Sequence, residues 1–116
     1  KSISKILGAK EPPDSIVSNR LYDLMAGKFK DKSFGTYKYH GEWNILDQII
    51  VSGSLLSPQA PMHTSKADAH IADFPFLLEK DEKYFGIKPF RTFYGMKYQN
   101  GYSDHLPVYA DFQLLF

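Results

Sequence analysis

The apolar residues of this chain fall into short segments that end at glycine or proline, and this spacing limits the length of any regular element. Residues 36–39 alternate apolar and polar side chains before Gly41, and residues 108–114 alternate near the carboxyl end. Such alternation is typical of half-buried strands. Residues 45–51 are apolar apart from two polar positions, which indicates a buried strand. The pattern therefore favours strands as the main elements.

One segment has helical spacing instead. The proline pair at 12–13, followed by Asp14, forms a helix-start signal, because proline restricts the preceding backbone and aspartate accepts hydrogen bonds from free amides. Apolar residues then recur at helical spacing as far as Met25, and Gly27 is a stop signal. We therefore predict a helix over residues 14–25 with one face packed on a sheet.

The middle of the chain has a weaker pattern. Pro58, Pro61 and Pro75 interrupt the stretch between Leu56 and Pro89, so we predict loops with short elements there. The charge run at 79–83 is more typical of a solvated turn than of a binding patch. Together with the helix, these patterns predict an α/β (α+β) fold in which strands outnumber helices.

Composition excludes several classes of protein. With 43% apolar and 16% aromatic residues the chain is not disordered, and 116 residues suffice for one domain over 1–116. Because there is no cysteine, disulfides, zinc-thiolate sites and thiol nucleophiles are excluded. No apolar run approaches the roughly 20 residues of a membrane span. A net charge of +1 creates no strong field, so a phosphate ligand must be held by local groups or a metal, and the cellular compartment is undetermined.

The segment Ser103-Asp104-His105-Leu106-Pro107-Val108 places an acid and an imidazole side by side just before an apolar strand. Aspartate supplies the hard oxygen ligands that magnesium and manganese prefer, and histidine transfers protons near neutral pH. Taken alone, an Asp-His pair in a turn also fits an ordinary solvated turn. The context of the pair has to decide between these interpretations.

Asp47 is the second polar residue that calls for an explanation, because it lies among isoleucine, leucine and valine. A carboxylate in such surroundings is costly to bury without a donor or a cation nearby. One candidate partner is His105, whose tautomer Asp47 would fix. The alternative is a structural aspartate whose oxygens accept hydrogen bonds from backbone amides.

The two segments together resemble the endonuclease/exonuclease/phosphatase superfamily, which includes deoxyribonuclease I-like nucleases, inositol polyphosphate 5-phosphatases and sphingomyelinases. The resemblance rests on Ser103 to Val108 and on a Trp-x-x-Leu-Asp-x-Ile-x-Val-Ser segment, residues 43–52, about fifty residues upstream. It implies a deoxyribonuclease I-like, two-sheet α/β sandwich, of which this chain resembles the carboxyl-terminal half.

The resemblance also implies roles for individual residues. His105 would contact the scissile phosphate as general base or transition-state stabiliser, and Asp47 would orient it. Asp104 would be a ligand of Mg²⁺ or Mn²⁺ or lie close to that metal. A metal-activated water would attack phosphorus in line, with no covalent enzyme intermediate.

The chain departs from the family in two ways. Family members carry a first half with a metal-binding Glu, and we find no such half here; the Asp and Asn of the family's Gly-Asp-Phe-Asn loop are also missing after Leu7-Gly8. We therefore expect the amino-terminal half to be a partner, and the isolated chain to hydrolyse little or nothing. An exposed apolar sheet face would favour self-association. The alternative function is a non-catalytic binding or structural remnant.

Three further residues are candidates for substrate binding. Tyr37 lies in the predicted strand 36–39, which ends beside Trp43 near the Asp47 segment and could line the substrate cleft. Arg91 can place a guanidinium on a substrate phosphate. The alternatives are core packing for the two aromatic rings and a surface ion pair for the arginine. The phosphoester substrate is open among nucleic acid, phosphorylated sugar or inositol, and phospholipid headgroup. The near-neutral charge argues mildly against a dedicated nuclease.

Overall fold

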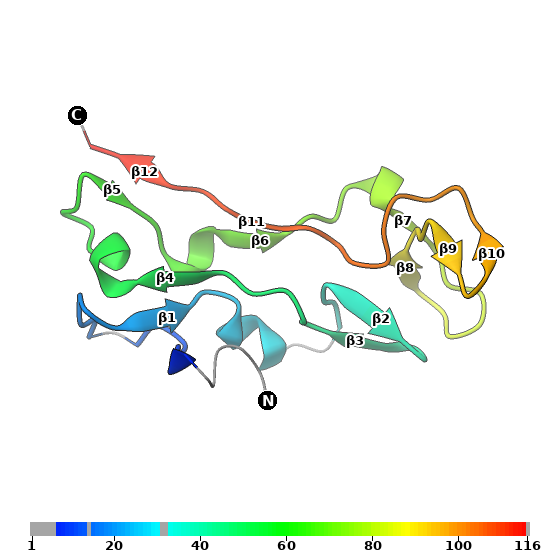
Figure 1. Ribbon diagram of the computed structural model, residues 1–116, viewed down its shortest axis with the longest axis horizontal. Helices are drawn as coiled ribbons and strands as arrows, with labels where there is room; N and C mark the ends of the chain where they lie inside the picture. The colour runs from blue at the N-terminus through cyan, green and yellow to red at the C-terminus, as the bar shows by residue number, and fades with distance from the viewer. Residues whose placement is uncertain (1–6, 14, 31–32, 116) are drawn as a thin grey trace. The chain divides into compact units, whose positions relative to one another are not determined.

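A computed structural model describes residues 7–13, 15–30 and 33–115 of the chain (Figure 1). The chain divides into two units. Unit 1 contains residues 1–28, 47–70 and 108–116, and unit 2 contains residues 29–46 and 71–107. The chain therefore leaves unit 1 and returns to it twice, and each unit is built from segments that are far apart in the sequence.

Unit 1 consists of short strands joined by 3₁₀ turns, and two of its elements, η1 and β6, run across a boundary with unit 2. Its antiparallel pairs are β1 with β4, β12 with β5, and β11 with β6. The elements are β1 (Leu21–Asp23), η1 (Ala26–Lys30), β4 (Ile50–Ser52), η2 (Gly53–Leu56), β5 (Met62–His63), η3 (Lys66–Asp68), β6 (Ala69–Ile71), β11 (Val108–Ala110) and β12 (Gln113–Leu114).

The helix predicted over 14–25 is wrong. Asp14 lies outside the described residues, and residues 15–25 form turns and strand β1 instead of a helix. In β1, Leu21 pairs with Ser52 and Asp23 pairs with Ile50 of β4. Figure 1 shows β1 and β4 side by side.

The backbone partners of this segment explain the error. The Leu24 N–H donates to the Ile49 carbonyl at 2.9 Å, and the Gly53 N–H donates to the Arg20 carbonyl at 2.8 Å. Bonds to distant segments thus replace the i to i−4 bonds that a helix requires. The apolar residues at helical spacing are buried by these tertiary contacts, which single-segment periodicity cannot reveal.

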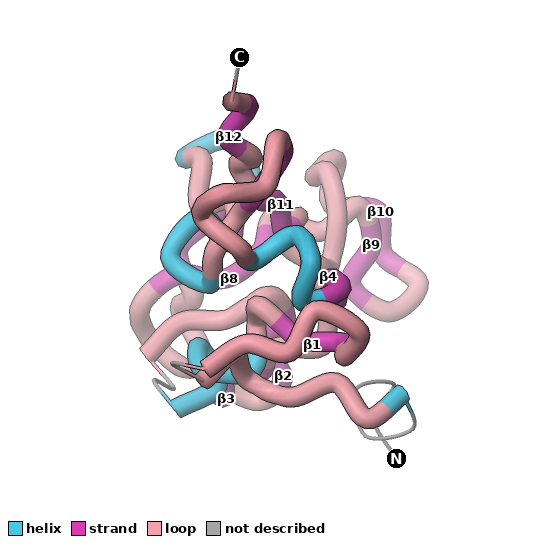
Figure 2. Tube along the Cα trace, turned by 90° about the vertical axis from the view of Figure 1, so that its left-hand side faces the viewer, coloured by secondary structure: helices cyan, strands magenta, loops and turns pink. Residues whose placement is uncertain are grey.

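Unit 2 is built from hairpins. Strands β2 and β3, β7 and β8, and β9 and β10 form its antiparallel pairs. Figure 2 shows that loops, drawn in pink, join these short magenta strands. The elements are β2 (Tyr37–Tyr39), β3 (Glu42–Asn44), η4 (Pro75–Leu77), β7 (Leu78–Lys80), β8 (Ile87–Pro89), β9 (Phe93–Tyr94) and β10 (Lys97–Tyr98).

The β2–β3 hairpin follows from its turn residues. Tyr39 pairs with Glu42, so the loop contains only His40 and Gly41, whose φ angles are +48° and +83°. Two positive φ angles are typical of a type I′ turn, whose twist matches that of the flanking strands. The strand predicted at residues 36–39 is present as β2, but its buried face is the opposite of the one that the pattern favours, because Lys38 is buried while Tyr39 is exposed.

The predicted fold class needs a second correction. The described residues form two-stranded antiparallel pairs, whereas a half-sandwich would supply one larger sheet. Residues 45–49 are extended without pairing as a strand, so β4 covers only the end of the predicted strand 45–51. The regular elements are mostly strands, as the alternation indicates. Among the described residues, no helix is long and apolar enough to cross a membrane.

Candidate active site

The Asp-His segment of unit 2 forms a tight turn that a neighbouring strand holds in place. The His105 N–H donates to the Ser103 hydroxyl at 3.1 Å, and His105 forms an antiparallel bridge with Tyr37. The Tyr37 and His105 ring centroids are 5.0 Å apart and the rings are tilted by 42°. Because His105 is only half-buried, its imidazole is held by protein on one side and can meet a ligand on the other.

Leu106 anchors this turn. Its side chain is 1% exposed, and its N–H donates to the Thr36 carbonyl at 2.8 Å. Thr36 is itself fully buried, and its hydroxyl accepts the Leu46 N–H at 3.0 Å. A buried apolar residue next to His105 thus fixes the backbone that carries the imidazole.

Gly101, just before the Asp-His turn, allows the backbone to pack closely against Phe90 and Arg91, which follow β8. The Gly101 N–H donates to the Arg91 carbonyl at 3.0 Å, and the Tyr102 N–H donates to the Phe90 carbonyl at 2.7 Å. A Cβ atom at 101 would collide with both of these carbonyl oxygens. Glycine is therefore required here for close backbone contact.

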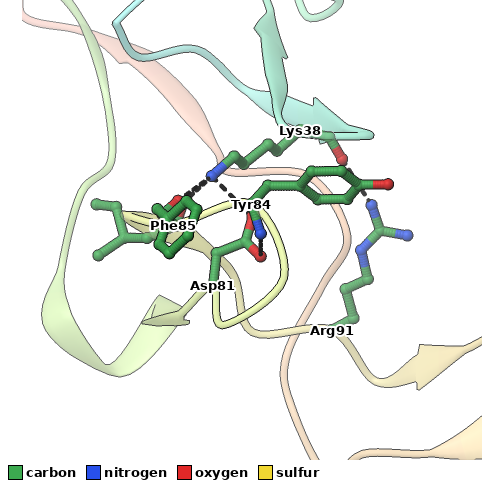
Figure 3. Close-up of polar contacts among 6 residues, drawn as sticks. Lys38, Asp81, Tyr84, Phe85 and Arg91 are labelled. Atoms are coloured by element: carbon green, nitrogen blue, oxygen red, sulfur yellow. Dashed lines mark hydrogen bonds and ion pairs between the residues drawn. The ribbon is translucent and has the colours of Figure 1, made fainter.

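Arg91 is a second residue that contacts the Tyr37 ring. Its guanidinium donates to the Lys38 carbonyl at 2.9 Å, a contact drawn in Figure 3, and lies 5.3 Å from the Tyr37 ring centroid. Arg91, Tyr37 and His105 therefore form a chain of contacts, in which the tyrosine ring touches both the cation and the imidazole. An arginine has five N–H donors in a planar fork that suits phosphate oxygens.

A buried ion pair holds the strand that carries Tyr37. The Lys38 ammonium lies 2.8 Å from the Asp81 carboxylate, and their side chains are 6% and 4% exposed. The ammonium also donates to the carbonyls of Phe85 and Ile87 at 2.9 and 3.0 Å. Figure 3 shows Lys38 reaching from β2 into the β7–β8 loop to make these bonds. Three oxygens thus satisfy its three donors.

The environment of Asp81 has opposing effects on its acidity. Burial acts to raise the pKa of Asp81, but the Lys38 hydrogen bond, the Tyr84 N–H and the charges of Lys38 and Lys88 outweigh it and lower the pKa. The carboxylate is therefore charged when it meets Lys38. The prediction of a solvated turn for residues 79–83 is wrong at Asp81, which is 3% exposed. The partner of Asp81 is Lys38, which apolar–polar alternation would place on the exposed face of β2 but which is buried in the structure.

The other predicted site residues lie in different environments. Trp43 is 9% exposed and packs on Phe34 with centroids 4.7 Å apart, so its contacts are those of a core residue. Asp104 is exposed beside His105. Asp47 is half-buried in the extended segment before β4 and belongs to unit 1. Its predicted role in orienting His105 stays a prediction.

Asp104 can offer carboxylate oxygens to a divalent cation, but a bound metal needs several protein or water ligands. Within residues 7–13, 15–30 and 33–115, no three His, Asp or Glu side chains form a group that could hold a metal ion. These residues therefore do not build a complete metal site by themselves.

Comparison with known proteins gives one result that bears on the site. A family model described as "Endonuclease/Exonuclease/phosphatase family" matches residues 1–113, which is nearly the whole chain. Searches of curated proteins and of solved structures gave no match. The matched range includes both the Asp47 segment and the turn with Asp104 and His105.

Proposed function

The chain belongs to the endonuclease/exonuclease/phosphatase family, and from this premise we propose that it takes part in metal-dependent phosphoester hydrolysis through the Asp104-His105 turn. Family membership supports a phosphoesterase-type function in general. The particular residues and the need for Mg²⁺ or Mn²⁺ are our proposal.

The observation that carries the proposal is the contact chain of Arg91, Tyr37 and His105. The guanidinium of Arg91 lies 5.3 Å from the Tyr37 ring centroid, and the His105 ring centroid lies 5.0 Å from the same point. Both belong to segments fixed by backbone hydrogen bonds, so neither group has to be ordered when a ligand arrives. Preorganised donors of this kind stabilise the charge that develops in a transition state.

In the proposed reaction, water attacks phosphorus in line with the leaving oxygen. His105 accepts the proton that the water gives up and the new P–O bond forms. The bond to the leaving oxygen breaks, and that oxygen takes a proton from solvent to leave as an alcohol. The guanidinium of Arg91 donates to the equatorial oxygens, where negative charge grows. The products are an alcohol and a phosphate ester with one ester bond fewer.

We propose that Asp104 supplies one oxygen ligand to the metal. Asp104 is exposed beside His105, so its carboxylate is accessible to a cation from solvent. A bound divalent cation would add Lewis-acid polarisation of the phosphate. The described residues do not complete its coordination shell, so no step of the reaction is assigned to it.

The test is a hydrolysis assay with bis(p-nitrophenyl) phosphate and millimolar Mg²⁺, on the longest form of the protein that carries this chain. His105→Ala should lower turnover by about 10²- to 10⁴-fold, because that is the usual contribution of a positioned proton-transfer group. His63→Ala is the matched control, since His63 is a half-buried histidine of unit 1 whose Nδ1 contacts the Ala60 carbonyl at 3.1 Å.

The alternative is a non-catalytic binding or structural remnant of the family, and the lack of a three-ligand metal group among the described residues favours it. Calorimetric titration with Mg²⁺ and Mn²⁺ separates the two. No heat of binding and no hydrolysis by the longest form would leave only the remnant. Turnover that His105→Ala does not change would contradict the assignment of His105.

A further inference from the structure

A hollow of about 230 Å³ opens on unit 2 beside the Arg91–Tyr37 contact. Its wall is mainly aromatic and cationic, and includes Tyr39, His40, Tyr84, Lys88, Arg91 and Tyr94. We call this hollow the ring groove. Its volume is below the range of about 300–1,000 Å³ for drug-sized ligands, so it suits one ring system and its substituents.

The rings of the groove are close to parallel. Tyr37 and Tyr39 are 6.5 Å apart with 12° between their planes, Tyr39 and His40 are 4.0 Å apart with 11°, and His40 and Tyr84 are 6.2 Å apart with 23°. Successive residues of β2 and its turn thus present a row of similarly oriented faces. Tyr39 remains 57% exposed, so the row is open to a ligand.

Cations lie against the rings. Lys83 is 5.3 Å from the Tyr84 centroid, Lys88 is 5.5 Å from that of Tyr94, and Arg91 contacts both Tyr37 and Tyr94. The fourth basic lining residue, Lys38, is neutralised by Asp81.

The positive charge is limited further by Glu79, which faces Lys88 across the β7–β8 pair. A ligand with several clustered phosphates would need more converging cations than these. Parallel rings bordered by a few cations instead suit planar bases linked by single phosphates, because bases stack on aromatic faces and their backbone pairs with basic side chains.

We propose that the ring groove binds single-stranded nucleic acid, with a base stacked on the Tyr39 row and the adjoining phosphate on Arg91 and Lys88. Tyr37 contacts His105, so a strand held in the ring groove would present a phosphodiester to the imidazole. This consequence, unlike binding, rests on the proposed function. Binding itself requires no hydrolysis, and the two proposals can therefore fail separately.

The test is fluorescence anisotropy of labelled oligothymidylate, six nucleotides long, with the whole chain in EDTA, where cleavage by a metal-dependent enzyme is absent. An abasic oligomer with the same number of phosphates measures the contribution of the bases. Tyr39→Ala should weaken binding by about 5- to 150-fold, the range found for stacking rings. Tyr94→Ala should weaken it because the Lys88 and Arg91 cations, which meet the phosphate, lie against the Tyr94 ring. Tyr39→Trp should retain it.

Two further variants complete the design. Arg91→Gln should reduce the slope of log K against log salt by about 0.7, as expected for one lost phosphate contact on a single strand. Tyr109→Ala is the matched control, because Tyr109 is a similarly exposed tyrosine of unit 1 that does not line the groove. Its affinity should equal that of the wild type.

Equal binding of the abasic oligomer, or wild-type affinity of both Tyr39→Ala and Tyr94→Ala, would overturn the proposal. So would tighter binding of inositol hexakisphosphate or of anionic phospholipid vesicles than of the oligothymidylate. Base-dependent binding in a protein that never hydrolyses a phosphoester would uphold the groove and refute the proposed function.

Discussion

The two units bury and expose different kinds of side chain. Unit 1 buries mainly apolar residues, among them Leu24 and Met25, and its exposed large apolar residues are mostly aliphatic. Unit 2 buries the charged pair of Lys38 and Asp81, and most of the large exposed aromatic rings belong to it. Unit 1 buries the Asp23 carboxylate as well, where it accepts the Met25 N–H at 2.9 Å, whereas in unit 2 a buried cation and a buried carboxylate meet.

This difference bears on the proposal that unit 2 carries the site. A buried ion pair gains little stability over apolar packing, because both charges lose their water. Lys38 and Asp81 instead hold β2 against the β7–β8 loop, and the same strand carries Tyr37 to His105. Local departures from core rules are expected at functional sites. Substitutions made in matched pairs, one in each unit, test this contrast.

The largest effect on stability is expected from Lys38→Met. It leaves Asp81 buried without its cation, and breaking a buried pair in this way costs about 3–5 kcal/mol. The control is Lys66→Met in unit 1, whose contact with Glu11 is 3.9 Å long and more than half-exposed at the lysine, so it should cost about 0–1 kcal/mol. Urea unfolding followed by circular dichroism measures both, and equal costs would contradict the contrast between the units.

The next largest effect on the free energy of unfolding is expected at two leucines that are each 1% exposed. Leu24→Ala in unit 1 and Leu106→Ala in unit 2 should each lower the free energy of unfolding by about 2–5 kcal/mol, because both leave cavities. Only Leu106 adjoins His105, so only its variant should also reduce turnover of folded protein. Turnover corrected for the folded fraction distinguishes them, and a similar loss in Leu24→Ala would count against the special position of Leu106.

The smallest effect is a pH dependence. Because the folded-state pKa of Asp81 is lowered, its stabilising contribution is present above the unfolded value of about 3.9 and is lost as pH falls through the folded pKa. The difference in unfolding free energy between wild type and Asp81→Asn should therefore shrink below about pH 4. The same comparison for Asp111→Asn, an exposed carboxylate of unit 1, provides the reference. A difference that grows on acidification would have the wrong sign.

Local signals in the sequence predict strand β2 of unit 2 and its end at Gly41, but not its hairpin partner β3. The alternation through Tyr39 and the turn at Gly41 depend only on neighbouring residues, and the structure has both. The helix predicted over 14–25 failed because its polar backbone groups pair with residues tens of positions away, such as Ile49 and Gly53. No pattern within one segment carries that information.

The sequence also names several residues of the candidate site, but not all of them. The motif identifies Asp104 and His105, and the structure brings Tyr37 and Arg91 into one chain of contacts with His105. The roles of these residues stay predictions. Asp81 was missed, because the charges around it in the sequence resemble those of a solvated turn. Its burial follows only from the partner that a distant strand supplies, Lys38.

The most direct test of the account is a ¹H–¹⁵N NMR titration of the labelled chain with dimethyl phosphate, a simple phosphodiester. If unit 2 carries the phosphoester chemistry, the largest amide shifts will occur at Tyr37, at Arg91 and through Ser103 to His105, all in unit 2. Shifts concentrated instead at basic residues of unit 1, such as Arg20 and Lys66, would contradict the claim that unit 2 carries the phosphoester chemistry.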